Sequence, residues 1–480
     1  MRSNREPERE PGSGRRLVIV GGGMAGTRLA QQLATAAGGS VGSVDVTVIG
    51  EEPHPAYNRV LLAEVLAGRY APGVIALPAL AAGRRLSGVR VVRLDRDPGE
   101  VVCDDGRRVP YDSLVLATGS NPVLPPLRGL FEPHGHELPD GVHAFRTMDD
   151  CLALAAAVRP GARAVVIGGG LLGVSAARAL AQRGAQVVLA HQGEHLMERQ
   201  LDAGASRVLR QHVEALGVEV HTECRVRGLR TRSLDGGGRA VSAAELADGY
   251  ALEADLVVLA CGVRPRVGLA RAAGLDVARG VVVDDELRTS DPRVFAIGDC
   301  AEHGGVLYGL AGPAQDQADV LARILSPTPP LPEAGGLCPQ DPRGSAQVVG
   351  NRSAEGAPPS GSWGRNGWAQ PGHRGAPGSE TGPRYTGSRA LTRLTLAATS
   401  NPLDLAAFGE TTPAPGDDVV QLADATRNAY RKVVVRGDRL VGGILLGDLG
   451  SVGALARTWE GDEPLPSTPL LHLLTNDGGS

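Results

Sequence analysis

Hydrophobic residues before residue 330 follow the same local pattern twice. In each copy an apolar run leads into a glycine cluster, an alanine- and leucine-rich helical stretch follows, and a second apolar run completes the pattern. The first copy runs from Arg16 to Gly50, and the second runs from residue 162 to Ala190. An apolar strand, a helix and a second apolar strand form a βαβ unit. The repetition therefore predicts an α/β chain that contains two related domains.

The composition and the hydrophobic pattern of the chain change after this duplication. Residues 341–384 are rich in glycine, proline and serine and show neither a helical nor an alternating apolar period, which predicts a linker or a disordered insertion. Trp363 and Trp368 fall inside that segment, so a docking role is the alternative interpretation. Residues 386–446 contain short alternating runs between turn residues, which predicts strands of a small α+β domain.

Composition and charge narrow the class of protein. A chain of 480 residues is long enough for about three domains. Its net charge of -4 argues against nucleic acid as a partner, because no general cationic surface is available for phosphate backbones. No apolar stretch typical of a secretory signal or a membrane span is present, so we expect a cytoplasmic protein without a membrane partner.

The cysteines do not predict a metal or dithiol site. All six are far apart in the sequence and none forms a CxxC pair, which excludes a local zinc knuckle and an adjacent redox pair. We therefore expect no metal site, and we expect most cysteines to be small buried apolar groups.

Both glycine clusters have the spacing G-x-G-x-x-G. The first glycine permits a tight turn, the second lets the backbone approach a pyrophosphate, and the third lets the helix pack on the strand. The anion then lies at the helix N-terminus, where free N–H groups favour negative charge. Two such motifs, each inside a βαβ unit, predict two dinucleotide sites; the glycines are Gly21, Gly23, Gly26, Gly168, Gly170 and Gly173.

In a dinucleotide site, the residue after the second strand of the βαβ unit can bind the ribose of the cofactor. Glu51 follows the first copy and is placed to accept hydrogen bonds from a ribose diol. His191 takes that position in the second copy, and no arginine follows it within seven residues. This favours NADH modestly over NADPH. A solvent-facing loop residue is the alternative interpretation of His191.

Several further segments carry a family resemblance. LVLATGS at 114–120 and VFAIGDCAEH at 294–303 are apolar strands that run into Thr-Gly and Gly-Asp turns. With these, the chain resembles the FAD and pyridine-nucleotide-dependent oxidoreductases that have two dinucleotide-binding domains. It is most similar to the flavoprotein part of the NAD(P)H nitrite reductase large subunit, and rubredoxin reductases are near relatives. The resemblance covers residues 15 to about 326 and part of the C-terminal region, with its strongest segments at 51–68, 145–151, 196–202, 262–270 and 288–303.

The resemblance implies a glutathione-reductase-type fold of two Rossmann-like domains plus the small C-terminal α+β domain. The implied boundaries are a disordered N-terminus at 1–14, a discontinuous FAD-binding domain at 15–145 and 265–330, an NAD(P)H-binding domain at 146–264, a linker at 331–385 and a C-terminal domain at 386–480.

The resemblance also assigns cofactors to residues. It implies NADH or NADPH on Gly168, Gly170 and Gly173, and it implies FAD on Gly21, Gly23, Gly26, Glu51, Arg59, Thr118, Gly119 and Asp299. Arg59 would face the pyrophosphate, although an ordinary surface arginine is the alternative. Residues 311–325 read as a helix that has Pro313 in its first turn. In the family this helix points its positive N-terminal end at the flavin.

Two departures from related enzymes affect the expected chemistry. Residues Tyr57 to Leu66 contain no cysteine, which disfavours disulfide and persulfide reduction. Relatives commonly carry glutamate two residues after the third glycine of the second motif, near the nicotinamide, where this chain has Ser175. Hydride transfer centred on the flavin requires no side-chain acid or base, so no catalytic proton-transfer residue is expected.

These features predict an NAD(P)H-dependent flavoprotein oxidoreductase that passes electrons to a separate redox protein. The expected acceptor is an iron–sulfur and sirohaem reductase or a small iron carrier in a nitrite or nitrate reductase system. Only Cys338 follows residue 300, whereas an iron–sulfur cluster needs about four thiolates. A rubredoxin or ferredoxin reductase outside nitrogen metabolism and a slow-turnover flavin redox sensor remain alternatives.

Overall fold

The computed structural model describes residues on both sides of the predicted linker. The described residues are 14–36, 44–326, 382–396, 402–424, 426–447, 449, 452–461, 464–465 and 474. The predicted disordered N-terminus and the predicted linker lie outside them, apart from residue 14 and residues 382–385, and so do Cys338, Trp363 and Trp368. The described residues from 14 to 326 and from 384 onward fall in one compact unit.

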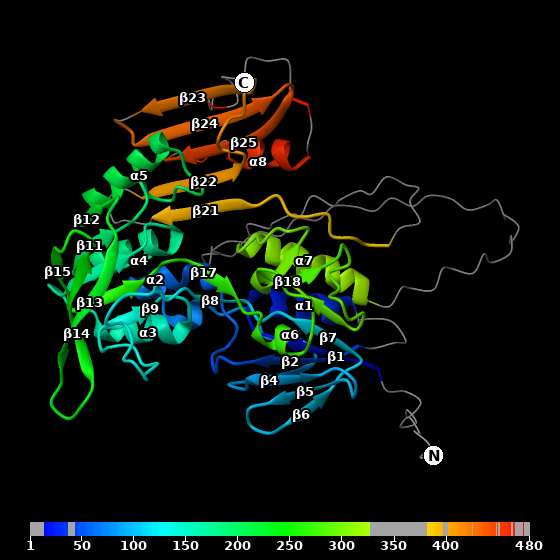
Figure 1. Cartoon of the computed structure of the whole chain (residues 1–480). Helices are drawn as coiled ribbons and strands as arrows, with labels where there is room; N and C mark the ends of the chain where they lie inside the picture. Colours follow the sequence, from blue (N-terminus) through cyan, green and yellow to red (C-terminus); the bar gives the residue numbers. More distant parts are fainter. Residues whose placement is uncertain are drawn as a thin grey trace, which may run out of the picture. The chain divides into compact units, whose positions relative to one another are not determined.

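A five-stranded parallel sheet forms the first Rossmann domain, in the order β19-β7-β1-β2-β3. Four of its strands, β1, β2, β7 and β19, are mostly buried on both faces, as expected where helices cover a parallel sheet, whereas the edge strand β3 is polar and partly exposed. Helices α1 (Met24–Ala36) and α7 (Ala311–Leu325) pack against each other beside it (Figure 1). The strands are β1 (Arg15–Val20), β2 (Val44–Gly50), β3 (Arg84–Ser87), β7 (Ser113–Leu116) and β19 (Val294–Ala296).

Smaller elements complete this domain. Strands β4, β5 and β6 form an antiparallel sheet, and β18 pairs with β20 in parallel. Their bounds are β4 (Val91–Asp95), β5 (Glu100–Cys103), β6 (Arg108–Pro110), β18 (Val281–Val283) and β20 (Ala301–His303). The short helices are η1 (Arg59–Leu61), α2 (Leu62–Leu66), η2 (Pro72–Ile75), α6 (Gly268–Ala272) and η3 (Gly298–Cys300).

The second Rossmann domain repeats the plan with a parallel sheet in the order β12-β11-β10-β16-β9. Its strands are β9 (Val142–Ala144), β10 (Arg163–Ile167), β11 (Gln186–Ala190), β12 (Val218–His221) and β16 (Leu256–Leu259). Its helices are α3 (Met148–Ala157), α4 (Leu171–Gln182) and α5 (Ala203–Ala215). An antiparallel sheet joins it, made of β13 (Val226–Ser233), β14 (Arg239–Leu246) and β15 (Ala251–Glu253).

The chain passes between the two Rossmann domains along a pair of short antiparallel strands. β8 (Ser120–Pro122) carries it out of the first domain and β17 (Val263–Pro265) brings it back. Pro122 lies opposite Val263 in this pair. The whole second domain is therefore an insertion whose two ends lie side by side.

The C-terminal domain is an antiparallel sheet in the order β21-β22-β25-β24-β23, with α8 (Val452–Gly461) packed on it. Buried residues of β24 and β25 share a core with α5 of the second domain (Figure 1). The strands are β21 (Leu391–Leu396), β22 (Leu403–Gly409), β23 (Asp418–Asp424), β24 (Ala429–Arg436) and β25 (Arg439–Leu446).

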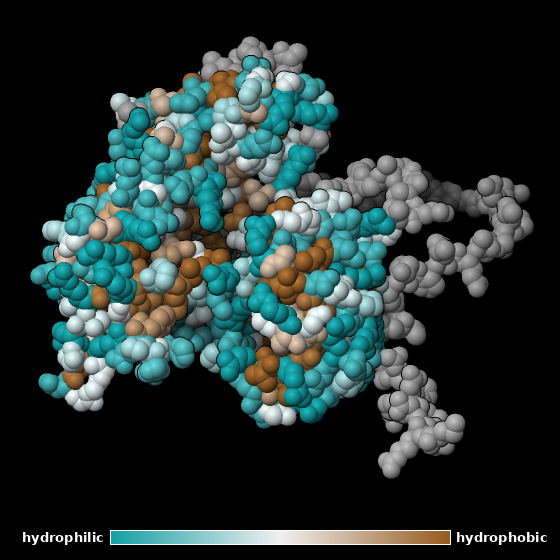
Figure 2. Space-filling model, in the orientation of Figure 1, coloured by the Kyte–Doolittle hydropathy of each residue, from teal (hydrophilic) through white to brown (hydrophobic). Residues whose placement is uncertain are grey.

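These observations confirm the predicted fold class of two Rossmann-like domains with a small C-terminal α+β domain. Hydrophilic residues cover most of the face seen in Figure 2, and hydrophobic residues gather there in separate patches. Among the helices that the structure describes, none has the length and apolar character needed to span a bilayer.

Candidate functional site

One large pocket brings together the glycine turns of both Rossmann domains. Its volume is about 1430 Å³, above the roughly 300 to 1,000 Å³ of common ligand pockets. Of the residues singled out from the sequence, those that line it are Gly21, Gly23, Glu51, Arg59, Thr118, Gly119, Gly168, Gly170, Ser175, His191 and Asp299. Gly26 and Gly173 do not line it.

The first motif has a separate steric reason for each glycine. A Cβ on Gly21, whose φ is +123°, would lie 2.0 Å from the carbonyl oxygen of Ala117. A Cβ on Gly26 would lie 2.1 Å from the carbonyl oxygen of Gly21, so this glycine lets α1 pack on β1. A Cβ on Gly23 would meet nothing within 4 Å, because it would project into the pocket.

The second motif repeats this arrangement at the start of α4. A Cβ on Gly168 would lie 2.4 Å from the carbonyl oxygen of Ala260, and one on Gly173 would lie 1.7 Å from the carbonyl oxygen of Gly168. Gly170 again faces open space. Each motif thus leaves room for an anion next to the free N–H groups of a helix N-terminus, which fits the pyrophosphate of a dinucleotide.

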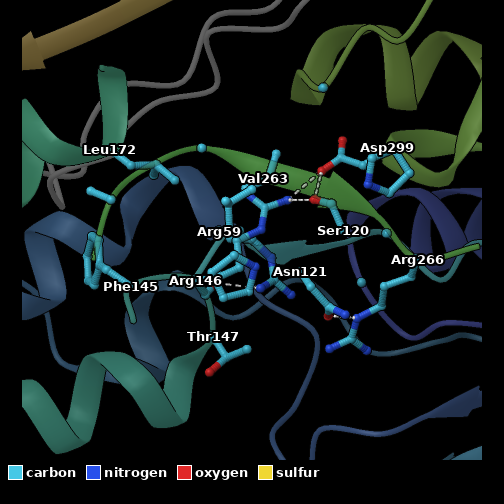
Figure 3. A pocket seen from close by; sticks show the side chains of 18 of the residues that line it. Arg59, Ser120, Asn121, Phe145, Arg146, Thr147, Leu172, Val263, Arg266 and Asp299 are labelled. Carbon is cyan, nitrogen blue, oxygen red and sulfur yellow. Dashed lines mark hydrogen bonds and ion pairs between the residues drawn. The ribbon is translucent and has the colours of Figure 1, made fainter. Parts of the chain in front are cut away.

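Asp299 lies at the centre of a polar cluster on the pocket wall (Figure 3). Its carboxylate accepts a hydrogen bond of 2.7 Å from the hydroxyl of Ser120 and forms an ion pair with Arg146. Arg146 also donates to the Ser120 hydroxyl, at 2.8 Å. Both charged side chains are about five-sixths buried, at 15% and 16% exposure, so each charge relies on the other.

Arg59 belongs to a second polar cluster on the same wall. Its guanidinium pairs with Glu52 at 2.7 Å and donates to the backbone carbonyl of Arg146. Tyr57 donates to Glu52 at 2.6 Å. Burial alone would raise the pKa of Glu52, but Arg59 and these hydrogen bonds hold it below its usual value. Arg59 is therefore a partly buried side chain that lines the pocket and is held by Glu52.

Glu51 reaches the pocket from the end of β2 and pairs with Arg266, a residue that follows β17. The backbone carbonyl of Arg266 accepts a hydrogen bond of 2.9 Å from the hydroxyl of Thr118. The backbone N–H of Arg266 donates to the carbonyl of Gly119, also at 2.9 Å. The Thr-Gly turn is thus tied to the strand that returns from the second domain.

Ser175 and His191 occupy the part of the pocket formed by the second domain. The Ser175 hydroxyl donates to the carbonyl of Leu171 in its own helix at 2.7 Å, and the residue is only 7% exposed. Nδ1 of His191 accepts a hydrogen bond of 3.1 Å from the backbone N–H of Gly169. Burial lowers the pKa of His191 and favours its neutral form.

Helix α7 also points into this pocket. It spans the residues expected from the sequence, 311–325, and Pro313 lies in its first turn. Leu310 and Ala311 at its start line the pocket, so the positive end of the helix faces the site. Gln317, which is 1% exposed, accepts a hydrogen bond of 2.7 Å from the backbone N–H of Gly298 and so links α7 to the Asp299 turn.

Sequence reasoning did not identify Arg146, Ser120 or Arg266 as site residues. Arg146 and Ser120 lie in segments that carry the resemblance, FRTMDDC at 145–151 and LVLATGS at 114–120. The only signal for Arg146 in the sequence is its place as an arginine within a segment that carries the resemblance. Its partner Asp299 is 153 residues away, so the ion pair itself has no local signature.

The described cysteines behave as isolated thiols. Cys103, Cys151 and Cys300 are buried, and Cys224 and Cys261 are partly buried. In the described ranges no group of three or more His, Cys, Asp and Glu side chains is arranged to hold a metal ion.

Comparison with protein-family models identifies two matches. The model for the pyridine nucleotide-disulphide oxidoreductases matches residues 15–318. The model for the C-terminal domain of rubredoxin NAD+ reductases matches residues 401–458.

Curated proteins and solved structures give similar results. The chain is 31% identical to a nitrite reductase [NAD(P)H] of Bacillus subtilis, over 96% of this chain and 49% of that protein. It is 37% identical to the assimilatory nitrate reductase electron transfer subunit of the same organism, over 65% of this chain and 39% of that protein. The chain therefore spans about half or less of these relatives. A putidaredoxin reductase in covalent complex with putidaredoxin shares the fold, with a TM-score of 0.72 at 22% identity, over 96% of this chain and 98% of that one.

Proposed function

Because this chain belongs to the pyridine nucleotide-disulphide oxidoreductase family, we propose that it passes electrons from NAD(P)H through FAD to a separate redox protein. The proposed setting is a nitrite or nitrate reductase system, in which this chain is the electron-transfer component. The observation that carries the proposal is the single pocket onto which two dinucleotide-type glycine turns open, one from each domain.

Family membership confirms several predictions made from the sequence. The recognised family, the class of NAD(P)H-dependent flavoprotein oxidoreductase, and FAD with NADH or NADPH as cofactors all agree with the matched model and relatives. The role of each site residue and the domain boundaries remain proposals.

The first domain offers a binding surface that suits FAD. We propose that the Gly21–Gly26 turn and the N-terminus of α1 hold the pyrophosphate and that Glu51 holds the adenosine ribose. Asp299 would hold the ribityl chain, with Arg146 and Ser120 fixing the direction of its carboxylate. Arg59 keeps a positive charge facing the same pocket. When bound, FAD supplies the redox chemistry by accepting a hydride and releasing electrons singly or in pairs.

The second domain would hold the reduced coenzyme. The Gly168–Gly173 turn and the N-terminus of α4 are the proposed pyrophosphate site, and Ser175 lies one turn into that helix. The dipole of α7 would stabilise negative charge that develops at the pocket floor. No acid or base among the described residues is assigned a proton-transfer role.

An electron-acceptor protein is the proposed partner. The putidaredoxin reductase that shares this fold forms a complex with putidaredoxin, and the C-terminal match is to a rubredoxin NAD+ reductase domain. We propose an iron–sulfur and sirohaem reductase as the acceptor, with the linker and C-terminal domain as its docking region. The cytoplasm is the proposed compartment.

The first experiment measures which electron acceptors the purified chain can reduce. With NADH or NADPH it should reduce ferricyanide, yet it should form no ammonium from nitrite. Nitrite reduction to ammonium needs six electrons, whereas a flavin delivers at most two per turnover. Ammonium formation by this chain alone, at a rate that matches coenzyme oxidation, would contradict the proposal.

A rubredoxin or ferredoxin reductase outside nitrogen metabolism is the second candidate. The match of residues 401–458 to the rubredoxin NAD+ reductase C-terminal domain favours it. Steady-state reduction of a purified rubredoxin, a ferredoxin and a sirohaem reductase separates the two candidates, because the physiological acceptor should give the highest kcat/KM.

A further inference from the structure

The end of β11 lacks the acidic residue that reads an unphosphorylated ribose in many dinucleotide sites. His191 occupies this position, and its Nδ1 is held by the backbone N–H of Gly169. Its Nε2 is buried and makes no hydrogen bond to the described residues. The imidazole is therefore fixed against the glycine turn and presents no negative charge there.

Two arginines lie near His191 although neither follows it closely in the sequence. The backbone N–H of Cys224 donates to the carbonyl of His191 at 2.8 Å, which brings the neighbouring Arg225 to this end of the sheet. The backbone N–H of Met197 donates to the carbonyl of Gly169 at 2.9 Å, which holds the segment that contains Arg199 against the glycine turn. Both arginines line the same pocket as the second glycine motif.

The guanidinium groups of Arg199 and Arg225 are exposed, and in the described part of the chain neither is engaged by an acidic side chain. Arg227 differs, because it pairs with Glu245 at 2.9 Å. An exposed arginine that lines a ligand pocket without an acidic partner is available to bind an anionic ligand.

One acidic residue, Glu198, also lines this part of the pocket. The carboxylate of Glu198 lies beside the imidazole of His191, since a Cβ on Gly193 would be 2.2 Å from Glu198 Oε2 and 2.8 Å from His191 Nε2. Glu198 forms no ion pair with either arginine in the described structure. His195 and Glu194 are on the same loop, and neither lines the pocket.

We propose that Arg199 and Arg225 bind the 2′-phosphate of NADPH, so that this protein uses NADPH at least as well as NADH. The inference rests on the proposed function, since it concerns the coenzyme of the same site. It also revises the modest preference for NADH that the sequence favoured. The seven residues directly after His191 contain no arginine, whereas Arg225 comes from the turn between β12 and β13.

A direct binding experiment tests the inference without electron transfer. Calorimetry on the FAD-loaded protein would compare adenosine 2′,5′-bisphosphate with AMP, which lacks the 2′-phosphate. The bisphosphate should bind about tenfold or more tightly, because the two guanidinium groups would form charge-assisted hydrogen bonds with its 2′-phosphate. Equal affinity for the two nucleotides would overturn the inference.

Single substitutions then test whether Arg199 and Arg225 cause the preference for the bisphosphate. Arg199→Ala and Arg225→Ala should each remove most of the preference for the bisphosphate and lower the ratio of kcat/KM for NADPH over NADH about tenfold. Arg207→Ala is the matched control, because Arg207 is an exposed arginine on α5 that does not line the pocket. Absorbance of bound FAD reports whether each variant has folded.

The outcomes separate this inference from the proposed function. Tight bisphosphate binding that depends on the two arginines, in a protein that fails to reduce any acceptor, would support the inference and contradict the proposed function. Electron transfer that is equally efficient with both coenzymes before and after both arginine substitutions would overturn the inference and leave the proposed function intact.

Discussion

At the scale of single residues, the pocket depends on the carboxylate of Asp299. It is held in place by Ser120 and Arg146, which come from different segments of the chain. We predict that Asp299→Ala loses FAD readily, because the substitution removes the proposed ribityl ligand and leaves Arg146 buried without its counter-charge. The ratio of flavin to protein absorbance after dialysis measures this loss.

Asp97→Ala is a matched control for that experiment. Asp97 is an exposed aspartate in the turn between β4 and β5 and does not line the pocket, so its removal should leave FAD retention unchanged. If Asp299→Ala holds FAD as tightly as the parent, the assigned ribityl contact is wrong.

His191 gives a second prediction at this scale. A carboxylate at the end of β11 accepts hydrogen bonds from a ribose diol and repels a 2′-phosphate. We therefore expect His191→Glu to raise the ratio of kcat/KM for NADH over NADPH by about tenfold. His221→Glu is the control, since His221 is on the neighbouring strand β12 and does not line the pocket. An unchanged ratio for His191→Glu would show that this position does not read the ribose.

The residues that could be predicted from the sequence are those whose role is steric and local. Gly26 and Gly173 are examples, because a Cβ on either would meet the carbonyl oxygen of Gly21 or Gly168 in the same turn, so spacing alone identifies them. Arg146 and Arg225 could not be found in this way, because the residues that they lie beside in the folded chain are far away in the sequence. Charge complementarity across the fold leaves no periodic signal.

At the scale of elements, an ion pair joins one helix from each Rossmann domain. Arg178 of α4 pairs with Glu64 of α2 and is only 1% exposed. Removing one partner of a buried pair costs about 3 kcal/mol or more, since the remaining charge stays buried. We predict that Glu64→Ala lowers the melting temperature by about 5 °C or more, measured by the loss of bound flavin on heating.

The pair between Arg210 and Glu214 provides the comparison for this prediction. It is an exposed pair on α5, four residues apart. Glu214→Ala should cost about 0.5 kcal/mol or less, and the melting temperature should hardly change. Equal effects of the two substitutions would mean that burial does not strengthen the contact between α4 and α2.

Helix α5 connects the second domain to the C-terminal sheet through one carboxylate. Asp202 caps the helix by accepting from the N–H of Ala205, and it also binds Lys432 and Tyr430 of β24, at 2.7 and 2.8 Å. Burial would raise the pKa of Asp202, but these hydrogen bonds and the Lys432 charge lower it below its usual value. The stabilisation is therefore complete at neutral pH and is lost as the pH falls through the lowered pKa.

The lowered pKa of Asp202 leads to a testable prediction about stability in acid. Between pH 7 and pH 3 the melting temperature of the parent should fall more steeply than that of Asp202→Asn, which carries no titrating group at this contact. The parallel variant Asp97→Asn should follow the parent curve. If Asp202→Asn and the parent respond equally to acid, the contact with Lys432 contributes nothing that depends on charge.

At the scale of the whole molecule, the alternation of strands and helices was enough to predict two Rossmann domains and a separate C-terminal sheet. The packing of β24 and β25 against α5 was not predictable, because the residues in contact are more than 200 residues apart in the sequence. The way the domains share a single pocket likewise follows from β8 and β17, which are too short to show a period.

The paired strands β8 and β17 also have an evolutionary consequence. A segment whose ends lie next to each other can be gained, lost or exchanged without stretching the rest of the chain. The second Rossmann domain, the proposed coenzyme-binding domain, is therefore an insertion that joins the first domain at the paired residues Pro122 and Val263. Recombination at this one junction could therefore replace the proposed coenzyme-binding domain, while the proposed flavin-binding domain stayed the same.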